Sequence, residues 1–162
     1  MEKRLEEFKL ELHPEKTKIV YCKDVNRKGG SDNNNFTFLG YEFRPQKAKN
    51  KYGGYFLSLI PAISEEAKEK MRRTIREWQI QRFTNKSIEN IAQDINKIVM
   101  GWINYYGKFC SSELYPIKKY IDLKLVKWAV HKYKKIRGSQ RCANKWLKGI
   151  KKRKPELFAH WR

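Results

Sequence analysis

The chain has 162 residues, enough for one domain or two very small ones, and its 40% hydrophobic and 14% aromatic content can fill a core. Disorder of the whole chain is therefore excluded. The formal net charge is +20 and the sequence pI is about 9.9. A surface this positive attracts polyanions and speeds their encounter, so the composition predicts nucleic acid as the partner.

The positive charge is concentrated in the C-terminal part of the chain. Residues 1–64 hold 12 Lys and Arg against 8 Asp and Glu, whereas residues 65–162 hold 25 against 9. Residues 127–154 contain no acid at all. A merely solvated helix usually mixes charges of both signs, and phosphate binding relieves the repulsion in such a run while releasing counterions. This segment therefore favours nucleic-acid contact, although charge alone predicts no sequence specificity.

Other classes of protein lack support in the sequence. Cys22, Cys110 and Cys142 are odd in number and form no Cys-x-x-Cys pair, so we expect reduced thiols and a cytoplasmic protein. The longest apolar stretch, residues 56–63, is far shorter than the roughly 18 residues of a membrane span, and we expect no membrane partner. The charged N-terminus argues against a signal peptide.

The N-terminal residues predict one short helix and one strand. Residues 2–10 have the pattern of a short helical fragment that His13-Pro14 must end, because proline disfavours helix in the residue before it. Residues 18–22 are rich in β-forming side chains and predict a strand, whereas residues 24–35, dense in Gly, Asn, Asp and Ser, predict a loop.

Two further segments predict a β-hairpin. Residues 36–43 alternate in the manner of a strand, and residues 55–60 follow the turn signal Tyr52-Gly53-Gly54. We expect the two segments to pair in antiparallel fashion around a long loop. Pro61 is expected to end the second strand.

From Ser64 onward the hydrophobic period is helical. Ser64 and Ser87 are the predicted N-caps of two helices, since a serine oxygen accepts hydrogen bonds from the first free backbone amides. Gly101 is expected to mark a kink or a close packing point. The predicted apolar stripes are Ala67, Met71, Ile75 and Trp78 in the first helix, and Ile88, Ile91, Ile95 and Ile98 in the second.

Residues 114–135 are predicted to form the longest helix, apolar on two sides and therefore central in a bundle. Gly138-Ser139 is expected to break it, residues 140–150 to form a shorter helix, and Leu157, Phe158 and Trp161 to tether the tail. The two stripes of the long helix are Leu114, Ile117, Ile121, Leu125 and Trp128, and Leu123, Val126, Val130 and Tyr133. The predicted fold class is α+β, with a short antiparallel β part followed by a mainly helical bundle.

Basic residues on these helices are the candidate nucleic-acid contacts. Lys124, Lys127, His131 and Lys134 stand at i, i+3, i+7 and i+10, a spacing that allows one helix face to follow a phosphate backbone. The complete candidate set is Lys68, Arg72, Arg76, Lys124, Lys127, His131, Lys132, Tyr133, Lys134, Lys135, Arg137, Arg141, Lys145, Lys148, Lys151 and Lys152.

Aromatic residues within the basic segment have two readings, base stacking and core packing. Trp128 lies in an apolar stripe and Trp146 is followed by Leu147, so core packing is the preferred interpretation of both. Tyr133 is the one fair stacking candidate. Asn104 stands among aromatic residues and is interpreted as structural in preference to ligand-reading.

Catalytic chemistry has no support in the spacing of the residues. The three histidines are scattered, no nucleophile with a base can be drawn, and no paired carboxylates suit two metal ions. We therefore predict no catalytic residue, no metal site and no cofactor.

Five motifs in consistent order resemble the C-terminal portion of a group II intron-encoded reverse transcriptase and maturase. Gly-Trp-Ile-Asn-Tyr-Tyr at residues 101–106 resembles the signature of the maturase, or X, domain, and Phe-Leu-Gly-Tyr-Glu-Phe at residues 38–43 resembles the last block of the polymerase palm. The remaining motifs are residues 10–18, which resemble the block after the polymerase active site, and residues 128–135 and 157–161.

The resemblance implies two domains, a remnant of the palm at residues 1–62 and a helical thumb and maturase-specific domain at residues 63–162. It implies a module of a mobile genetic element that grips intron RNA, assists its splicing fold, and holds an RNA/DNA template-primer duplex for an attached polymerase. Lys16 aligns with a lysine that such polymerases use as a proton donor to pyrophosphate.

Two departures from the family set the expected activity. The Tyr-Ala-Asp-Asp block, whose carboxylates hold two metal ions, lies upstream in the family and has no counterpart here. The His- and Cys-bearing endonuclease segment of some relatives is also missing. We therefore expect a non-enzymatic RNA-binding module from a truncated or split element.

Two alternatives remain open at this point. One is a subunit of a split reverse transcriptase, active only with an upstream reverse-transcriptase fragment. The other is a nonspecific basic nucleic-acid binder. A neighbouring reading frame for the missing palm would favour the first, and competition between intron RNA and bulk RNA would test the second.

Overall fold

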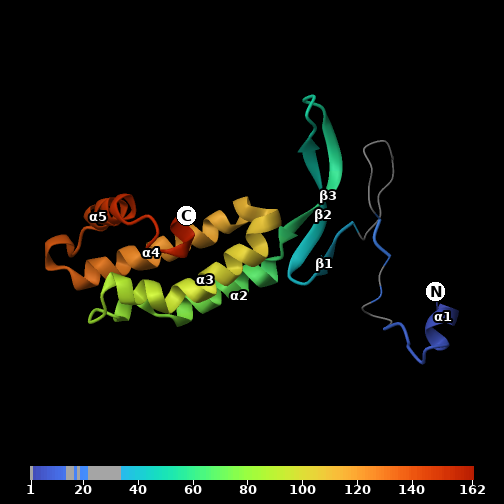
Figure 1. Ribbon diagram of the computed structural model, residues 1–162, viewed down its shortest axis with the longest axis horizontal. Helices are drawn as coiled ribbons and strands as arrows, with labels where there is room; N and C mark the ends of the chain where they lie inside the picture. The colour runs from blue at the N-terminus through green and yellow to red at the C-terminus, as the bar shows by residue number, and fades with distance from the viewer. Residues whose placement is uncertain (1, 14–16, 18, 22–33) are drawn as a thin grey trace. The chain divides into compact units, whose positions relative to one another are not determined.

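The computed structural model describes residues 2–13, 17, 19–21 and 34–162 (Figure 1). The chain divides into two compact units, Met1–Pro61 and Ala62–Arg162. The first carries a three-stranded antiparallel sheet and the second a helical bundle. The predicted α+β fold class is confirmed.

The N-terminal helix is shorter than predicted, because α1 spans Glu2–Glu6 and the chain then turns back on itself. The amide of Leu10 donates to the carbonyl of Leu5, and the amide of Lys9 to that of Glu6, each at 3.0 Å. Lys9 is left-handed with φ 56°. These are the bonds of a Schellman motif, which ends the helix at Glu6, well before His13.

The strand predicted at residues 18–22 is wrong where the structure describes it, since Ile19, Val20 and Tyr21 are irregular. Lys18 and Cys22 lie outside the described residues. So do Lys16 and Pro14, and most of the loop expected at residues 24–35.

The sheet has the order β1-β2-β3, with β1 at Phe36–Phe38, β2 at Tyr41–Lys49 and β3 at Tyr55–Ile63. The expectation of one strand over residues 36–43 is wrong. Leu39 and Gly40 have φ 50° and 79°, and two successive left-handed residues make the tight turn of a two-residue hairpin. Phe36 therefore pairs with Phe43, and their rings stack at 4.7 Å.

A second hairpin joins β2 to β3 at the predicted glycine turn. The Asn50 side-chain oxygen accepts hydrogen bonds from the amides of Tyr52 and Gly54 at 3.0 and 2.8 Å. Gly53 has φ +86°, a conformation that favours glycine. Pro61 does not end β3, contrary to expectation; β3 is an edge strand, where proline is tolerated.

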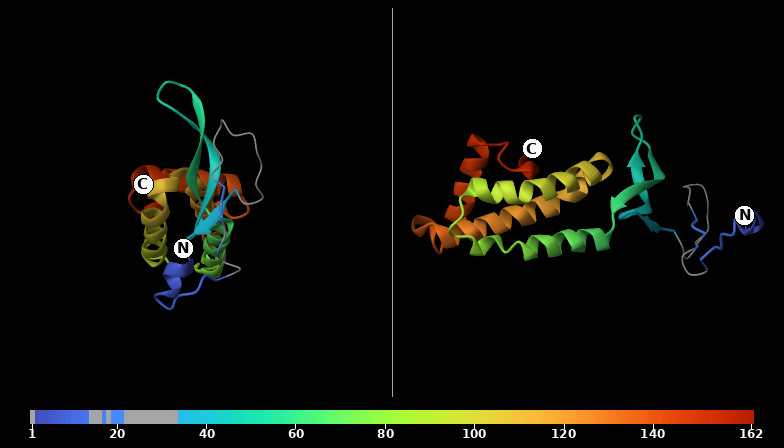
Figure 2. Two further views of the ribbon diagram at one scale, coloured as in Figure 1. Left: turned by 90° about the vertical axis from the view of Figure 1, so that its right-hand side faces the viewer. Right: turned by 60° about the horizontal axis from the view of Figure 1, so that its bottom comes forward.

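The helical unit consists of four helices: α2 (Glu65–Glu77), α3 (Ile88–Cys110), α4 (Tyr115–Lys132) and α5 (Gln140–Arg153). Short 3-10 turns connect and follow them: η1 (Ile80–Arg82), η2 (Ser111–Leu114), η3 (Lys134–Ile136) and η4 (Ala159–Trp161). Figure 2 shows α2, α3 and α4 running alongside one another. Both predicted N-caps are confirmed, since Ser64 accepts from the amide of Ala67 and Ser87 from that of Asn90, each at 3.2 Å.

Two expectations about helix length and shape are wrong. The longest helix is α3 with 23 residues, while α4 has 18 and ends at Lys132 because the chain tightens into η3. Gly101 lies inside unbroken α3, and a Cβ at this position would meet no atom within 4 Å. Gly101 therefore marks no close packing point.

The helix α4 packs against α2, α5 and η1, which confirms its central place in the bundle. The first predicted stripe of α4 is buried along its whole length, from Leu114 to Trp128. Of the second stripe only Val126 is fully buried, and Leu123 is 38% exposed. In α3 the predicted Ile98 is exposed and its neighbour Val99 is buried instead.

Two polar side chains fasten the C-terminal tail to the bundle. Asn96 of α3 donates to the carbonyl of Leu157 and accepts from the amide of Ala159, each at 2.9 Å. One oxygen of Asp122 on α4 accepts from the indole of Trp161 and lies 2.9 Å from Nε2 of His160, which is buried. The tail tether predicted from apolar residues thus also has a polar part.

Burial of the Asp122 carboxyl favours its neutral form, but the hydrogen bonds from His160 and Trp161 outweigh this effect and lower its pKa below 3.8. Its stabilisation is therefore complete above pH 3.8 and is lost as the pH falls through the folded value. We expect Asp122→Asn to reduce the unfolding free energy by about 2 kcal/mol at pH 7. Urea unfolding should show a constant difference from the parent above pH 3.8 that narrows as the pH falls below this value.

Asp94→Asn is the matched control, since Asp94 holds an exposed ion pair with Lys86 at 2.8 Å. Such pairs contribute roughly 0 to 1 kcal/mol. If Asp122→Asn loses no more unfolding free energy than the control, or if its loss does not change with pH, the proposed role of Asp122 in holding the C-terminal tail is contradicted.

Candidate nucleic-acid interface

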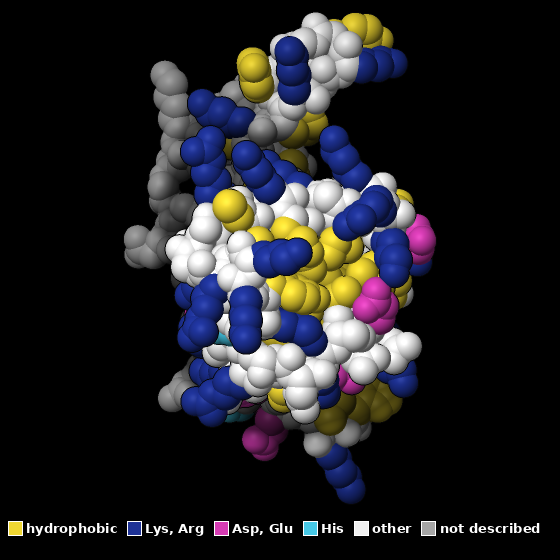
Figure 3. Space-filling view, turned by 90° about the vertical axis from the view of Figure 1, so that its left-hand side faces the viewer, with side chains coloured by type: hydrophobic (Ala, Val, Ile, Leu, Met, Phe, Trp, Pro, Cys, Tyr) yellow, Lys and Arg dark blue, Asp and Glu magenta, His cyan; other side chains and the backbone are white. Residues whose placement is uncertain are grey.

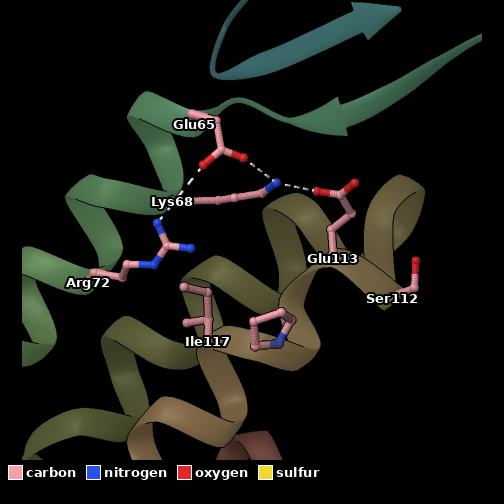
Figure 4. Close-up of a pocket in the computed structure, with 7 residues that line it drawn as sticks. Glu65, Lys68, Arg72, Ser112, Glu113 and Ile117 are labelled. Atoms are coloured by element: carbon pink, nitrogen blue, oxygen red, sulfur yellow. Dashed lines mark hydrogen bonds and ion pairs between the residues drawn. The ribbon is translucent and has the colours of Figure 1, made fainter. Parts of the chain in front are cut away.

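The structure sorts the predicted basic residues by whether a carboxylate of the protein already neutralises them. Lys68, Arg72 and Arg76 on α2 are neutralised in this way. Figure 4 shows Lys68 between Glu65 and Glu113, with its ammonium 2.9 and 2.7 Å from their oxygens. The Lys68 side chain is only 16% exposed.

Burial by itself would lower the pKa of Lys68, but the hydrogen bonds to Glu113 and Glu65 outweigh it and raise the pKa above 10.5. The adjoining cavity of about 390 Å³ is lined by two acids and two bases, with Ser112, Pro116 and Ile117 completing it. Opposite charges balance there, so the cavity has little attraction for a polyanion.

Arg72 and Arg76 both contact Glu69. The Arg72 guanidinium lies 3.7 Å from Glu69, and Arg76 donates a short hydrogen bond to the same carboxylate. The hydrogen bond from Arg76 lowers the pKa of Glu69. The positive charges of Lys68, Arg72 and Arg76 are therefore largely neutralised by acids of the protein itself.

Lys132 and Tyr133 are engaged in holding the fold. The Lys132 ammonium donates a short hydrogen bond to the carbonyl of Lys86 and lies 5.2 Å from the Trp128 ring centre. Tyr133 packs between Trp128 and Trp146, with ring centres 5.8 and 5.1 Å away, and desolvation raises its pKa. The one predicted stacking residue is thus half-buried in an aromatic cluster of the protein itself.

Trp128 is completely buried, and its indole donates to the carbonyl of Phe83 at 2.8 Å. The core role inferred for Trp128 is confirmed. Trp146 is half-buried against it, with ring centres 6.2 Å apart.

The predicted row on the long helix is shorter than expected. Lys127 and His131 are exposed on α4, and the Lys124 ammonium lies 5.2 Å from the Tyr120 ring centre. Lys134 lies beyond the end of α4, in η3. The expected common face for all four residues is therefore wrong, because α4 ends at Lys132.

The helix α5 carries the most uniform positive surface. Ala143, Leu147 and Ile150 form its buried face. Its outer face carries Arg141, Lys145, Lys148 and Lys152, all exposed, which we call the basic row. Their spacing of i, i+4, i+7 and i+11 covers about 16 Å at 1.5 Å per residue.

No carboxylate of the described residues forms an ion pair with the basic row, and the sequence has no acid between Asp122 and Glu156. Lys134, Lys135 and Arg137, in the turn before α5, are exposed as well. Lys151 is exposed on α5, with its ammonium 5.8 Å from the Trp161 ring centre. Figure 3 views the end of the helical unit where α4 turns into α5; many Lys and Arg side chains lie around an apolar patch there, and acidic side chains lie at one side of it.

Sequence reasoning treated all these cations alike, although a signal for the difference was present. Glu65 and Glu69 stand three residues before Lys68 and Arg72, the spacing of ion pairs on one helix face. It also missed Gly138 and Gln140, which line a cleft beside Lys127 and His131. No local pattern marks these two residues, because the cleft exists only once α5 folds back on α4.

Metal and membrane features are absent from the part of the chain that the structure describes. There, no three His, Cys, Asp or Glu side chains gather as a metal site would require. Nor is any helix of this part long and apolar enough to cross a membrane.

The fold and charge distribution define a small α+β protein whose helical unit has one uniformly cationic helix face. Residues 68–147 match the family model of the group II intron, maturase-specific domain. The match runs from α2 into α5, so this segment is a maturase-specific domain, and it supports the resemblance of the chain to the C-terminal part of group II intron maturases and reverse transcriptases that the motifs indicated. No curated protein and no solved structure matched the chain.

The network around Lys68 should contribute to stability. We expect Glu113→Gln to reduce the unfolding free energy by about 1 to 2 kcal/mol at pH 7, since it removes a half-buried charged hydrogen bond. Because the pKa of Lys68 is raised above 10.5, this contribution is complete below that pH and is lost as the pH rises through the folded value. Denaturant unfolding at pH 7 and pH 11 measures both effects.

Glu65→Gln is the control, because the Glu65 side chain is 75% exposed. We expect it to cost less than about 0.5 kcal/mol. If the two variants lose equal unfolding free energy, the contact between Glu113 and Lys68 stabilises the fold no more than an exposed ion pair does.

Proposed function

We propose that this protein is a non-catalytic RNA-binding module that binds group II intron RNA and assists its folding into the splicing-active form. The family match supports a maturase-type role. The observation that supports the position of the RNA is the basic row of α5, which has no ion-pair partner among the described residues.

The physical argument concerns the charge of the RNA. A compact intron brings many phosphates together, and their repulsion opposes folding. A cationic surface that neutralises phosphates releases counterions and stabilises the compact form. The exposed cations of the turn before α5, Lys134, Lys135 and Arg137, extend this surface next to the basic row.

We infer a role without catalysis because the matched segment is the maturase-specific domain. The palm-like motifs of the first unit support a second candidate, a subunit of a split reverse transcriptase. In that case an upstream fragment supplies the polymerase carboxylates, and this chain holds the template-primer duplex.

The contribution of the basic row can be separated from that of charge in general. We expect the quadruple change of Arg141, Lys145, Lys148 and Lys152 to Gln to weaken RNA binding. Each lost phosphate contact should flatten the plot of log K against log salt by roughly 0.7 to 0.9, so the slope should fall by about 3. Filter binding over a salt series measures the change.

The matched control changes four cations that are already in ion pairs. Arg72, Arg76, Lys86 and Lys154 pair with Glu69, Asp94 and Glu89. Their quadruple change to Gln removes the same formal charge and should change the slope by less than about 1. A larger effect for the control than for the basic row would contradict the proposed position of the RNA on the basic row.

The proposed function itself is tested by splicing. At a magnesium concentration at which a group II intron RNA splices slowly alone, the parent protein should accelerate splicing and the basic-row variant should not. Bulk RNA added in excess tests whether the effect is specific. If an unrelated protein of equal charge accelerates splicing equally well, the effect is one of nonspecific positive charge, and the proposed function is contradicted.

Primer extension distinguishes the two candidate functions. The purified chain with a primed RNA template, magnesium and deoxynucleotides should bind the template without extending the primer. Extension by this chain alone would contradict the non-catalytic proposal. Extension that appears only when an upstream palm fragment is added would favour the split enzyme.

A further inference from the structure

A cleft of about 400 Å³ lies where α4 and the start of α5 meet. Its lining residues are Val126, Lys127, Val130, His131, Gly138 and Gln140. All lie between Asp122 and Glu156, where the sequence has no acid, and none takes part in the aromatic cluster or in an ion pair of the described residues. The cleft is therefore not a by-product of the polar contacts that stabilise the bundle.

The chain direction explains why the cleft is open. After α4 and η3, Gly138 turns the chain with φ +80°, and Ser139 caps α5 by accepting from the amide of Cys142 at 3.3 Å. A Cβ on Gly138 would meet no atom within 4 Å. The mouth of the cleft is thus left unfilled at the turn, while Val126, at 1% exposure, is held in the core.

The lining of the cleft combines an apolar wall with polar side chains at its edge. Val130, which is half-buried, provides the accessible apolar surface above buried Val126, whereas Lys127, His131 and Gln140 are exposed polar groups. A carboxamide and an imidazole each offer both a donor and an acceptor, as the edge of a nucleobase does. Apolar surface suits the face of such a ring.

The volume and the surroundings also suit a nucleotide. Small-ligand pockets have volumes of about 300 to 1,000 Å³, and this cleft falls at the lower end of that range. Arg137 and Arg141 stand next in sequence to lining residues and are exposed. They can bind the phosphates on either side of a base that enters the cleft.

Base pairing decides which RNA can use such a site. Bases in a double helix are stacked and paired inside it, whereas unpaired bases in bulges and loops can be turned outward and contacted on their edges. An acidic peptide fits the cleft less well, because the lining offers a single Lys and two groups with no fixed positive charge.

We propose that this cleft binds one unpaired base of an RNA, with Val130 against the base, His131 and Gln140 at its edge, and Arg137 and Arg141 on the flanking phosphates. The proposal rests on the RNA-binding function proposed above. It adds a recognition element to a surface whose basic row contacts only phosphates.

Three hairpin RNAs of one sequence test the proposal with the full chain. The first has a single-nucleotide bulge, the second has the same bulge as an abasic site, and the third is fully paired. At one fixed salt concentration we expect the bulged RNA to bind about tenfold tighter than the other two, the order of magnitude that one bound base contributes.

The variant for this test is the double change His131→Ala and Gln140→Ala. Both side chains are exposed, so thermal melting should match the parent. We expect this variant to bind the bulged, abasic and paired RNAs with equal affinity, so that the preference of the parent for the bulged RNA is lost. The control is Lys148→Gln, because Lys148 belongs to the basic row and does not line the cleft. This change should lower the affinity for all three RNAs by the same factor.

The outcomes separate this proposal from the function on which it rests. If the parent binds none of the hairpins, the RNA-binding function fails together with the cleft. If the parent binds all three equally well, RNA binding stands and the cleft proposal is overturned. An abasic bulge that binds as tightly as the intact bulge overturns it too, because the backbone would then be recognised in place of the base. The proposal is also overturned if a poly-glutamate peptide displaces the bulged RNA from the parent protein but not from the double variant, because the cleft would then bind acidic peptide.

Discussion

The burial of Trp128 is the constraint on which the helical unit depends. Its indole is completely buried, and the one donor it has reaches the carbonyl of Phe83, 45 residues earlier in the chain. A buried N–H without an acceptor would cost free energy, so this hydrogen bond sets where the segment between α2 and α3 must lie. The Lys132 ammonium reinforces the same connection through the carbonyl of Lys86. The end of α4, the segment before α3 and the aromatic side of α5 are thereby held together.

This packing makes a one-sided charge distribution tolerable. Glu113 of η2, Glu69 of α2 and Asp94 of α3 form ion pairs within the protein, with Lys68, Arg76 and Lys86 respectively. What remains on α5 is positive charge without compensation, which repels itself and destabilises the folded state. The apolar face of α5, with Ala143, Leu147 and Ile150, offsets that cost by burial on the bundle. Binding of a polyanion would relieve this repulsion between like charges.

Affinity and recognition would then reside on neighbouring surfaces. The basic row offers only charge, which binds any phosphate backbone alike. The cleft between α4 and α5 offers shape, apolar surface and directional hydrogen-bonding groups. A protein that must bind a folded RNA in preference to bulk RNA needs both, because charge by itself does not discriminate.

Much of the helical unit was predictable from the sequence, because its signals are local. Ser64 and Ser87 were identified as caps, and the α4 stripe from Leu114 to Trp128 was identified as core, since capping and a helical period depend on residues within one or two turns. The β part was predicted less well. The turn at Leu39-Gly40 was missed because it needs a left-handed leucine, which sequence patterns disfavour. The end of α1 depends in the same way on a left-handed Lys9.

The amino-acid sequence by itself determined the excess of positive charge, the acid-free segment and the family motifs, all of which are properties of composition and order. The tertiary structure alone decided which cations remain available. It placed Lys68 beside Glu113, 45 residues away in the chain, and it placed Tyr133 between Trp128 and Trp146. It also made a cleft from Val126 and Gln140, which no local pattern connects. The reason is physical: neutralisation, burial and concavity depend on distances through space, and these are set only when the helices pack.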